Sequence, residues 1–337
     1  MALYRVLVMT NLWPTESDPG YGSFVRAQME SLRPLGVEFD LFFINGRESR
    51  WNYLRAVGDL RRRLKRQRYD LIHAHFGLSG LVARCQFKLP VVVSFMGDDV
   101  LGRPRRDGGI TPTGRFYQIS SFLLARLVAA VIVKSPEMKH RLGMESAHVI
   151  PNGVDLDLFH PIDRAEARRA LGLDPAKKFI LFPYDPAEAR KRYDLVEAAE
   201  ALARAEIPGI KILLARGVPR HLMPLYMNAA DVLVVASMFE GSPNAVKEAM
   251  AVNLPVVSVD VGDVADLFGS AQGNVLVARN AEAIAAGIIE VCRRGARSQG
   301  RERIARLAMP NVARQIVDVY ADMGRKKESG PRTQKSE

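Results

Sequence analysis

The sequence lacks most features that mark secreted, membrane-spanning or metal-cluster proteins. Its 337 residues contain only two cysteines, Cys85 and Cys292, which argues against a disulfide framework and against a cysteine-based metal site. No stretch approaches the roughly 18 apolar residues of a membrane-spanning helix, because Arg126 interrupts the run 123–133. The first residues have no long apolar core and no small-residue cleavage site. These absences predict a cytoplasmic, globular protein.

Length and composition favour two α/β domains. A chain of 337 residues, 48% of them hydrophobic, can bury two cores. Short apolar stretches alternate with helical patterns, which predicts doubly wound parallel sheets with crossover helices. The expected strands are 5–9, 37–43, 70–74, 90–95 and 130–134, then 178–183, 211–215, 232–236, 255–259 and 275–277. The expected helices are 23–35, 52–66, 78–87, 114–128 and 137–142, then 281–293, 301–307 and 311–323.

Breakers divide the chain into segments. Pro151, Asn152 and Gly153 indicate a linker after the first half. We expect a first domain over 1–160, a second over 161–308 and a last helix over 309–325. The tail 326–337 is polar, without apolar residues, and is expected to be disordered.

The stretch 231–250 is the most informative part of the sequence. Its apolar start predicts a buried strand, and Ser242 and Pro243 suit an N-cap and a first helical position. Free amides at such a turn, together with the helix dipole, favour an anion such as phosphate. Glu240 and Glu248 bracket the turn and could accept hydrogen bonds from hydroxyl groups. The alternative is two solvated glutamates on a surface helix.

This stretch resembles the Glu-x7-Glu signature of retaining glycosyltransferases of family 4, with EGSPNAVKE from Glu240 to Glu248. The sequence IPNGVD at 150–155 is similar to the interdomain junction of the same family. The resemblance implies the GT-B fold, in which two Rossmann-like domains face a central cleft and a C-terminal helix crosses back onto the first. It also implies transfer of a sugar from a nucleotide diphosphate sugar to an acceptor hydroxyl, in polysaccharide or glycolipid assembly.

The resemblance further implies a donor site in the second domain. Glu248 would bind the ribose and Glu240 the hydroxyls of the transferred sugar. Lys191 is the best match to the family lysine that neutralises the leaving diphosphate, with Arg192 sharing this role; the family's arginine in this loop has no evident counterpart. A surface charge cluster is the alternative. The turn residues expected to bind diphosphate or sugar are Gly241, Ser242, Pro243, Asn244 and Ala245.

The loop 11–24 offers a second contact with a phosphate or an acceptor. Gly20 and Gly22 let the backbone approach a ligand closely, and Ser23 can cap the following helix. The loop is not a dinucleotide fingerprint, because the third glycine is missing. A plain surface loop is the alternative.

Polar residues also follow two later strands of the first half. His73 and His75 share one strand face and could bind a metal, but no third ligand stands out. Family 4 enzymes need no metal for catalysis, so we expect His75 to line the cleft as a catalytic residue and His73 to be packed. Asp98 and Asp99 are expected to bind acceptor or sugar hydroxyls, with helix capping as the alternative. Met96 stands where the family has a histidine that contacts the donor sugar.

The net charge of +11 has a local source in the segment from Arg47 to Arg68. This basic, aromatic-containing helix suits either an anionic membrane surface or a solvated outer position. A lipid-linked saccharide acceptor at the inner face of the membrane would fit the first possibility. No reader motif accompanies the charge, so nucleic acid is not expected as a partner.

Two competing functions are compatible with the same fold class. A non-catalytic sugar-nucleotide-binding or scaffolding subunit would explain Met96 and the missing arginine. A nicotinamide-dependent oxidoreductase would require the glycine fingerprint and its acidic partner, which the sequence lacks. The favoured hypothesis is the glycosyltransferase, with no metal and no cofactor other than the nucleotide sugar itself.

Overall fold

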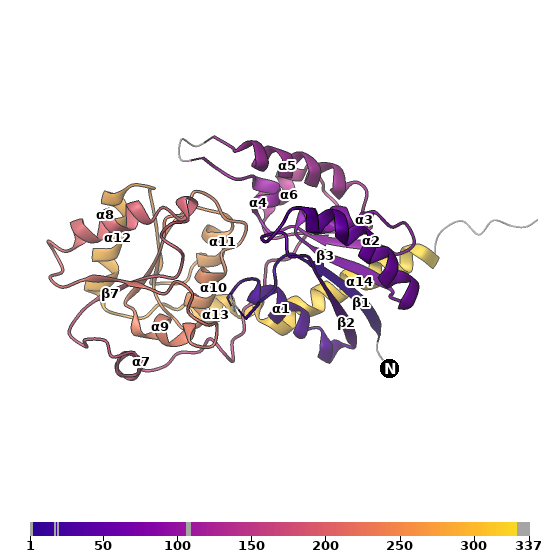
Figure 1. Cartoon of the computed structure of the whole chain (residues 1–337). Helices are drawn as coiled ribbons and strands as arrows, with labels where there is room; N and C mark the ends of the chain where they lie inside the picture. Colours follow the sequence, from indigo (N-terminus) through magenta and orange to yellow (C-terminus); the bar gives the residue numbers. More distant parts are fainter. Residues whose placement is uncertain (1–2, 17, 19, 106–108, 329–337) are drawn as a thin grey trace, which may run out of the picture.

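The computed structural model describes residues 3–16, 18, 20–105 and 109–328, and it contains two α/β halves that lie side by side (Figure 1). The first half contains a parallel six-stranded sheet of order β2-β1-β3-β4-β5-β6. Its strands are β1 (Tyr4–Thr10), β2 (Val37–Phe43), β3 (Leu71–His75), β4 (Val91–Ser94), β5 (Ala130–Val133) and β6 (His148–Val149). Its helices are α1 (Ser23–Glu30), α2 (Trp51–Arg66), α3 (Gly77–Arg84), α4 (Asp98–Leu101), α5 (Pro112–Ala125) and α6 (Pro136–Leu142).

The second half repeats this arrangement with a parallel five-stranded sheet of order β11-β10-β9-β7-β8. Its strands are β7 (Phe179–Phe182), β8 (Lys211–Leu214), β9 (Val232–Val235), β10 (Val256–Val259) and β11 (Val275–Val277). Its helices are α7 (Arg164–Ala170), α8 (Tyr193–Ala203), α9 (Met223–Ala229), α10 (Asn244–Ala251), α11 (Val264–Phe268), α12 (Ala281–Arg294) and α13 (Gly300–Ile304).

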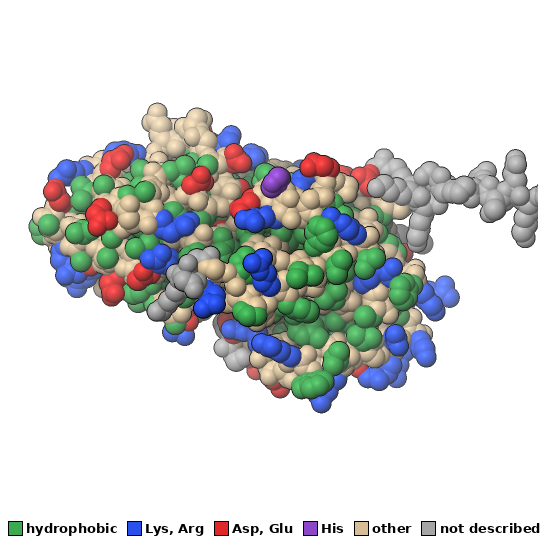
Figure 2. All heavy atoms as spheres, turned by 90° about the horizontal axis from the view of Figure 1, so that it is seen from above, with side chains coloured by type: hydrophobic (Ala, Val, Ile, Leu, Met, Phe, Trp, Pro, Cys, Tyr) green, Lys and Arg blue, Asp and Glu red, His purple; other side chains and the backbone are tan. Residues whose placement is uncertain are grey.

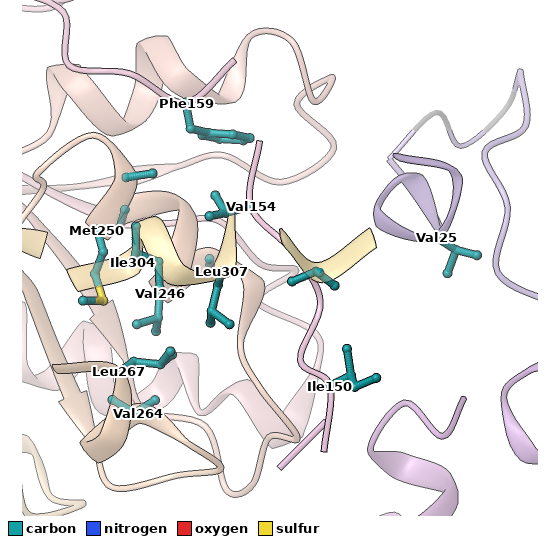
Figure 3. Close-up of a cluster of buried hydrophobic side chains, with 14 of the residues drawn as sticks. Val25, Ile150, Val154, Phe159, Val246, Met250, Val264, Leu267, Ile304 and Leu307 are labelled. Atoms are coloured by element: carbon teal, nitrogen blue, oxygen red, sulfur yellow. The ribbon is translucent and has the colours of Figure 1, made fainter. Parts of the chain in front are cut away.

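Strand alternation explains how helices cover both faces of each sheet. In β1, Leu7 and Met9 pack into a core with α2, α3, α5 and α6, whereas Val6 and Val8 face α1 on the opposite side. The core on the α1 side continues into the second half, where it includes Leu181 and residues of α9, α10 and α13. Figure 3 shows a part of this shared core around the linker. Because one apolar core spans both halves, their packing is continuous there.

The last helix, α14 (Met309–Glu328), returns from the second half to the first, as expected (Figure 1). Its Tyr320 is buried and packs edge-on against Tyr4 of β1, with ring centroids 5.8 Å apart. The helix runs to Glu328, so the expected tail begins later than residue 326. Residues 329–337, which make up the rest of that tail, lie outside the described part of the chain.

Most expected elements are present, and the differences have local causes. The expected helix 23–35 ends at Glu30 and is followed by a separate 3-10 turn, Arg33–Leu35, that contains Pro34. A proline has no amide hydrogen to donate and therefore interrupts a helix at that point. The expected helix 301–307 similarly divides into α13 and a 3-10 turn, Ala305–Leu307. Five short elements, β6, α4, α7, α9 and α11, were not expected.

Among the described residues, no helix combines the length and the apolar composition needed to cross a bilayer.

Candidate functional site

The turn between β9 and α10 carries Glu240 and Glu248. β9 is fully buried and ends at Val235, and α10 begins at Asn244. The expected cap is wrong by one residue, because Pro243 occupies the N-cap position and Ser242 precedes it. A proline at this position has no side-chain acceptor, and Ser242 Oγ instead lies 3.0 Å from Lys247 Nζ. Ser242 therefore holds a buried lysine rather than the helix amides.

Glu240 lies in a cluster of positive charge from the β7–α8 connection. Lys191 Nζ donates to Glu240 Oε1 at 2.5 Å, and Arg190 Nη1 lies 3.3 Å from the same oxygen. Lys191 also lies 3.6 Å above the ring of Tyr184. Burial alone would raise the pKa of Glu240, but Lys191 and Arg190 outweigh it and lower the pKa. The carboxylate is therefore ionised, with two cations in place around it.

The prediction for Arg192 is wrong in its geometry. Its guanidinium turns away from Glu240 and pairs with Asp194 at 2.7 Å, the second residue of α8. The backbone explains this, since Arg192 has a left-handed φ of 55° and ends the 3-10 turn Ala189–Lys191. Arg190, one residue before Lys191, occupies the place beside Glu240 instead.

Glu248 has its own cationic partner. Arg220 Nη1 donates to Glu248 Oε1 at 2.8 Å, and both side chains are largely buried. Burial raises the pKa of Glu248, although Arg220 opposes this effect. The two glutamates of the signature are thus positioned by separate arginines, Glu240 by Arg190 and Glu248 by Arg220.

Lys247 is a buried residue of the site that the sequence analysis missed. Besides Ser242, its ammonium donates to the carbonyl oxygen of Asn152 at 2.9 Å, and the Asn152 amide contacts Asn244 Oδ1 at 3.3 Å. Burial lowers the pKa of Lys247 to about 8, despite the opposing charge of Asp263. This lysine fixes the turn to the linker.

The turn is packed against the first half, in contrast to the open groove that the sequence suggested. A Cβ on Gly241 would lie 3.0 Å from Met138 Sδ and 3.4 Å from the carbonyl oxygen of Met96. A Cβ on Gly97 would lie 3.6 Å from the amide nitrogen of Gly241. Small residues on both sides therefore let the two backbones approach closely. Glu240 keeps 11% of its side chain exposed and Arg190 keeps 24%.

The structure agrees with one part of the prediction for the β1–α1 loop and differs from another. Gly22 has a φ of 70°, and a Cβ there would lie 2.2 Å from the carbonyl carbon of Leu12, so the position requires glycine. The expected cap is wrong, because Gly22 occupies the N-cap position and Ser23 is the first residue of α1. Ser17 and Pro19 of this loop lie outside the described residues.

The two aspartates after β4 have different roles. Asp99 is buried and accepts hydrogen bonds from the amides of Met96, Gly97 and Gly77 at 2.9–3.1 Å. Its carboxylate is occupied in holding two loops together, so its prediction as a hydroxyl ligand is wrong. Asp98 is the first residue of α4, is partly exposed and lies 3.5 Å from Arg103. Neither aspartate occupies the N-cap position, which belongs to Gly97.

The two histidines of β3 are stacked on each other, with ring centroids 4.3 Å apart. His73 contacts Tyr320 OH at 2.7 Å and Ser94 Oγ at 2.8 Å through its two nitrogens, which leaves neither for a metal. Burial lowers the pKa of His73 to about 3 and that of His75 well below its usual value. His75 is fully buried, and neither of its nitrogens has a hydrogen-bond partner within the described residues. It lies beneath the surface rather than lining a cleft.

Two buried lysines near the turn escaped the sequence analysis. Arg190 was recognisable there only as one of three adjacent cations, Arg190, Lys191 and Arg192, that a diphosphate would compensate. Lys247 lies within an apolar helical pattern, and Lys134, which is buried, follows the apolar strand β5. A lysine in such apolar surroundings is a usable signal, because isolated buried ammonium groups are costly and require partners.

Comparison with known proteins identifies the family. The model described as Glycosyltransferase Family 4 matches residues 3–158, and that described as Glycosyl transferases group 1 matches residues 193–307. The candidate teichuronic acid biosynthesis glycosyltransferase TuaC of Bacillus subtilis is 27% identical, over 84% of this chain and 88% of its own length. A D-inositol 3-phosphate glycosyltransferase of Pseudarthrobacter chlorophenolicus is 27% identical, over 66% of this chain and 61% of its own length.

Solved structures agree in fold. Sucrose-phosphate synthase from Thermosynechococcus elongatus has a TM-score of 0.78 at 20% identity, over 96% of this chain and 99% of that chain. Anabaena HepE, solved with UDP and glucose, has a TM-score of 0.68 at 17% identity, over 95% of this chain and 100% of that chain. The two family models together account for most of the chain, and the protein therefore belongs to the GT-B glycosyltransferases, with a family 4 first half.

Proposed function

We propose that this glycosyltransferase moves a sugar, with retention of configuration, from a nucleotide diphosphate sugar to an acceptor hydroxyl in polysaccharide or glycolipid assembly. The observation that carries the proposal is the cluster of Arg190 and Lys191 on Glu240, placed at the turn before α10. The names of two relatives, both glycosyltransferases, and the UDP bound to HepE support the donor class. UDP-sugars are accordingly the first donors to test.

The mechanism follows from where charge develops. As the bond from the sugar to the diphosphate breaks, the leaving oxygens gain negative charge, and fixed cations stabilise that charge in the transition state. Arg190 and Lys191 supply two cations that are already in place. The amides of Gly241, Ser242, Asn244 and Ala245 add fixed donors at the helix start, whereas Pro243 has no amide hydrogen. These groups would stabilise the diphosphate, and the proposal invokes no metal and no further cofactor.

Glu240 and Glu248 bind rather than attack. Glu240 is held by two cations, which lowers its basicity and suits hydrogen bonding to sugar hydroxyls. Glu248 is held by Arg220 and would accept from the ribose hydroxyls. The acceptor's proton then goes to the leaving phosphate on the same face of the sugar, and this front-face displacement retains the anomeric configuration.

Donor entry requires movement at the packed turn. Met96, Gly97 and Met138 of the first half lie against Gly241, so these contacts separate when the diphosphate reaches the amides. The shared core around the linker, anchored by Lys247 on Asn152, provides a fixed pivot for such a motion. Thermal stabilisation by a nucleotide would report this binding, at roughly 2.7 kcal/mol for ligand at 100 times its dissociation constant.

The alternative of a non-catalytic subunit loses one of its two arguments. It relied on Met96 and on the missing loop arginine, and Arg190 now occupies a place beside Glu240. Met96 contacts the turn through its backbone, whatever its side chain.

The test compares Glu240→Ala and Lys191→Ala with the unmodified protein in donor hydrolysis and transfer assays. Each is expected to reduce turnover by roughly 10²–10³-fold, the usual effect of removing one transition-state contact. Lys177→Ala, an exposed lysine of the same half that pairs with Asp174, is the matched control. Folded Glu240→Ala and Lys191→Ala proteins with full turnover would rule out the assigned roles, and an inverted anomeric product would rule out retention.

A further inference from the structure

A cavity of about 920 Å³ lies within the first half, between α2, α3 and α5. Its lining includes Asn11, which follows β1, and Phe76, which follows β3. Its walls are mainly apolar and aromatic, and they include Tyr53, Leu54, Val57, Leu81, Val82 and Phe116. A cavity of this size and lining suits an organic ligand with a large apolar part. None of its described lining residues belongs to the second half.

Positive charge lines this cavity. Arg47, Arg50 and Arg103 all line it, against a single acidic side chain, Glu48, among the described lining residues. The Arg47 guanidinium lies 4.2 Å above the ring of Tyr21, another lining residue, and one of its nitrogens pairs with Asp18 at 2.9 Å. An apolar cavity with guanidinium groups at its edge fits a ligand that is both apolar and anionic.

One lining residue of the cavity is paired with Asp98, at the start of α4. Arg103, which lines the cavity, lies 3.5 Å from Asp98. Burial opposes a high pKa for Arg190, but Glu240 and then Asp98 raise it, so Asp98 is electrostatically coupled to the same arginine that holds Glu240. The residue before Asp98 also lies close to the turn, since a Cβ on Gly97 would be 3.6 Å from the amide nitrogen of Gly241, which follows Glu240.

The outer side of α5 exposes a continuous apolar stripe, which we call the α5 face. Its helical spacing of three and four residues puts the side chains on one side of the helix. Phe87 joins this stripe, because Arg84 donates to the carbonyl oxygen of Leu127 and also lies 4.4 Å over the Phe87 ring. The α5 face consists of Phe87, Phe116, Ile119, Phe122, Leu123 and Leu127, with exposed fractions from 42% to 82%.

Figure 2 views the molecule from the side on which α5 lies in Figure 1, and it shows hydrophobic side chains gathered there with Lys and Arg side chains around them. Arg126 lies 3.4 Å over the exposed ring of Phe122. Across the cavity, α2 adds the exposed Trp51 and Leu54 to its many arginines. Apolar side chains that reach outward between basic ones match an interface with anionic headgroups.

We propose that the acceptor is an anionic lipid, taken from a bilayer on which the α5 face lies, with its apolar chain in the α2–α3–α5 cavity. The phosphate of the lipid would lie beside Arg47 and Arg103, and its sugar-accepting end would extend past Asp98 towards Glu240. This inference rests on the proposed function and names the class of its acceptor. It also extends to α5 the membrane contact that the sequence offered for α2 as one of two alternatives.

Cys85 provides a native reporter for the cavity. It lines the cavity and is exposed, whereas Cys292 is buried, so a thiol reagent should label Cys85 first. Octyl phosphate is expected to slow this labelling at least about fivefold. This factor corresponds to the binding energy that one arginine contributes to an anionic headgroup. Octanol should slow it less, and inorganic phosphate should leave it unchanged. Labelling that octyl phosphate does not slow, or that octanol slows equally, would overturn the assignment of the cavity.

Vesicle flotation tests the surface. The unmodified protein is expected to bind vesicles of phosphatidylcholine and phosphatidylglycerol and to bind pure phosphatidylcholine weakly. Ile119→Ser with Leu123→Ser should weaken binding to the anionic vesicles at least about tenfold, since two exposed apolar side chains are lost. Leu202→Ser, an exposed leucine of α8, is the matched control and should bind as before. Undiminished binding by the double variant would contradict the proposal.

Nucleotide binding separates this inference from the proposed function. If UDP stabilises the protein but octyl phosphate does not protect Cys85, the acceptor assignment fails and the transferase proposal stands. If octyl phosphate protects Cys85 but no nucleoside diphosphate binds, the donor proposal fails instead.

Discussion

Lys191 and Glu240 are 49 positions apart in the sequence, yet the lysine ammonium lies 2.5 Å from the glutamate carboxylate. The carboxyl ends of β7 and β9, which pair in parallel, bring the two loops to one edge of the sheet. Arg190 joins them, so one carboxylate has two cations within 3.3 Å. Arg190 also pairs with Glu188 at 3.5 Å, so the two cations face two carboxylates. The proposed mechanism requires the diphosphate to take the place of some of these contacts.

Arg190 and Arg192 give a direct test of the site, because both flank Lys191 but their guanidinium groups have different partners. Arg190→Ala should lower turnover roughly 100-fold, since it removes a cation beside the leaving group. Arg192→Ala should retain activity, because its guanidinium pairs with Asp194 away from Glu240. Steady-state kinetics with one donor decides between them. A loss of turnover confined to Arg192→Ala would restore the role expected from sequence.

The sequence was sufficient for the sheets because their strands are buried on both faces. Such strands are continuous apolar runs, and 232–236 or 255–259 are recognisable without any partner. The directions of Arg190 and Arg192 could not be predicted, because they depend on a left-handed backbone at Arg192 that no local signal specifies. The cavity could not be predicted for a similar reason, because its walls come from three helices that only the fold brings together.

The packed turn shows a second limit of the sequence. Gly97 and Gly241 lie in loops of different domains, and nothing in either loop indicates that the two backbones meet. The sequence also does not indicate that the carboxylate of Asp99 accepts hydrogen bonds from backbone amides of two loops. The signature predicted where Glu240 and Glu248 lie, whereas their partners Arg190 and Arg220 required the fold.

Arg220 should control how donor binding depends on pH. It lowers the pKa of Glu248 against the effect of burial, so Arg220→Gln should raise that pKa. The ionised carboxylate is the better acceptor for ribose hydroxyls. As the pH is lowered, the affinity of the variant for nucleotide should therefore begin to fall at a higher pH than the affinity of the unmodified protein. Calorimetric titration across the acidic range measures this, with Arg216→Gln, an exposed arginine paired with Asp185, as control.

Tyr320 should contribute to stability through its hydroxyl. Its OH is the partner of His73 Nδ1 at 2.7 Å, in a fully buried position between α14 and the first sheet. Tyr320→Phe leaves that nitrogen unpaired and should cost about 1–3 kcal/mol of unfolding free energy. Tyr4→Phe, which keeps the neighbouring ring contact, should cost less than about 1 kcal/mol. Equal losses in urea denaturation would show that the hydroxyl contact contributes nothing specific.

Lys134 should make stability depend on pH in the alkaline range. It is buried, its ammonium lies 3.3 Å from the carbonyl oxygen of Ile150, and burial with the nearby charge of Lys247 lowers its pKa to about 7, against the opposing charge of Asp99. An unfolded lysine titrates near 10.4. Between about pH 7 and pH 10 the unfolded chain therefore binds a proton that the folded chain does not, and stability rises with pH.

Lys134→Met removes this proton linkage. The variant should gain stability relative to the unmodified protein at pH 7 and below, where the buried lysine must be charged. Between about pH 7 and pH 10, that gain should shrink by about 1.4 kcal/mol for each pH unit. The substitution also removes the contact with Ile150. The resulting loss of stability is the same at every pH, so it changes the size of the stability difference between the two proteins but not its slope against pH. Urea denaturation at several pH values measures the slope, with Lys177→Met as the exposed control, and a difference independent of pH would contradict the assigned burial of a charged Lys134.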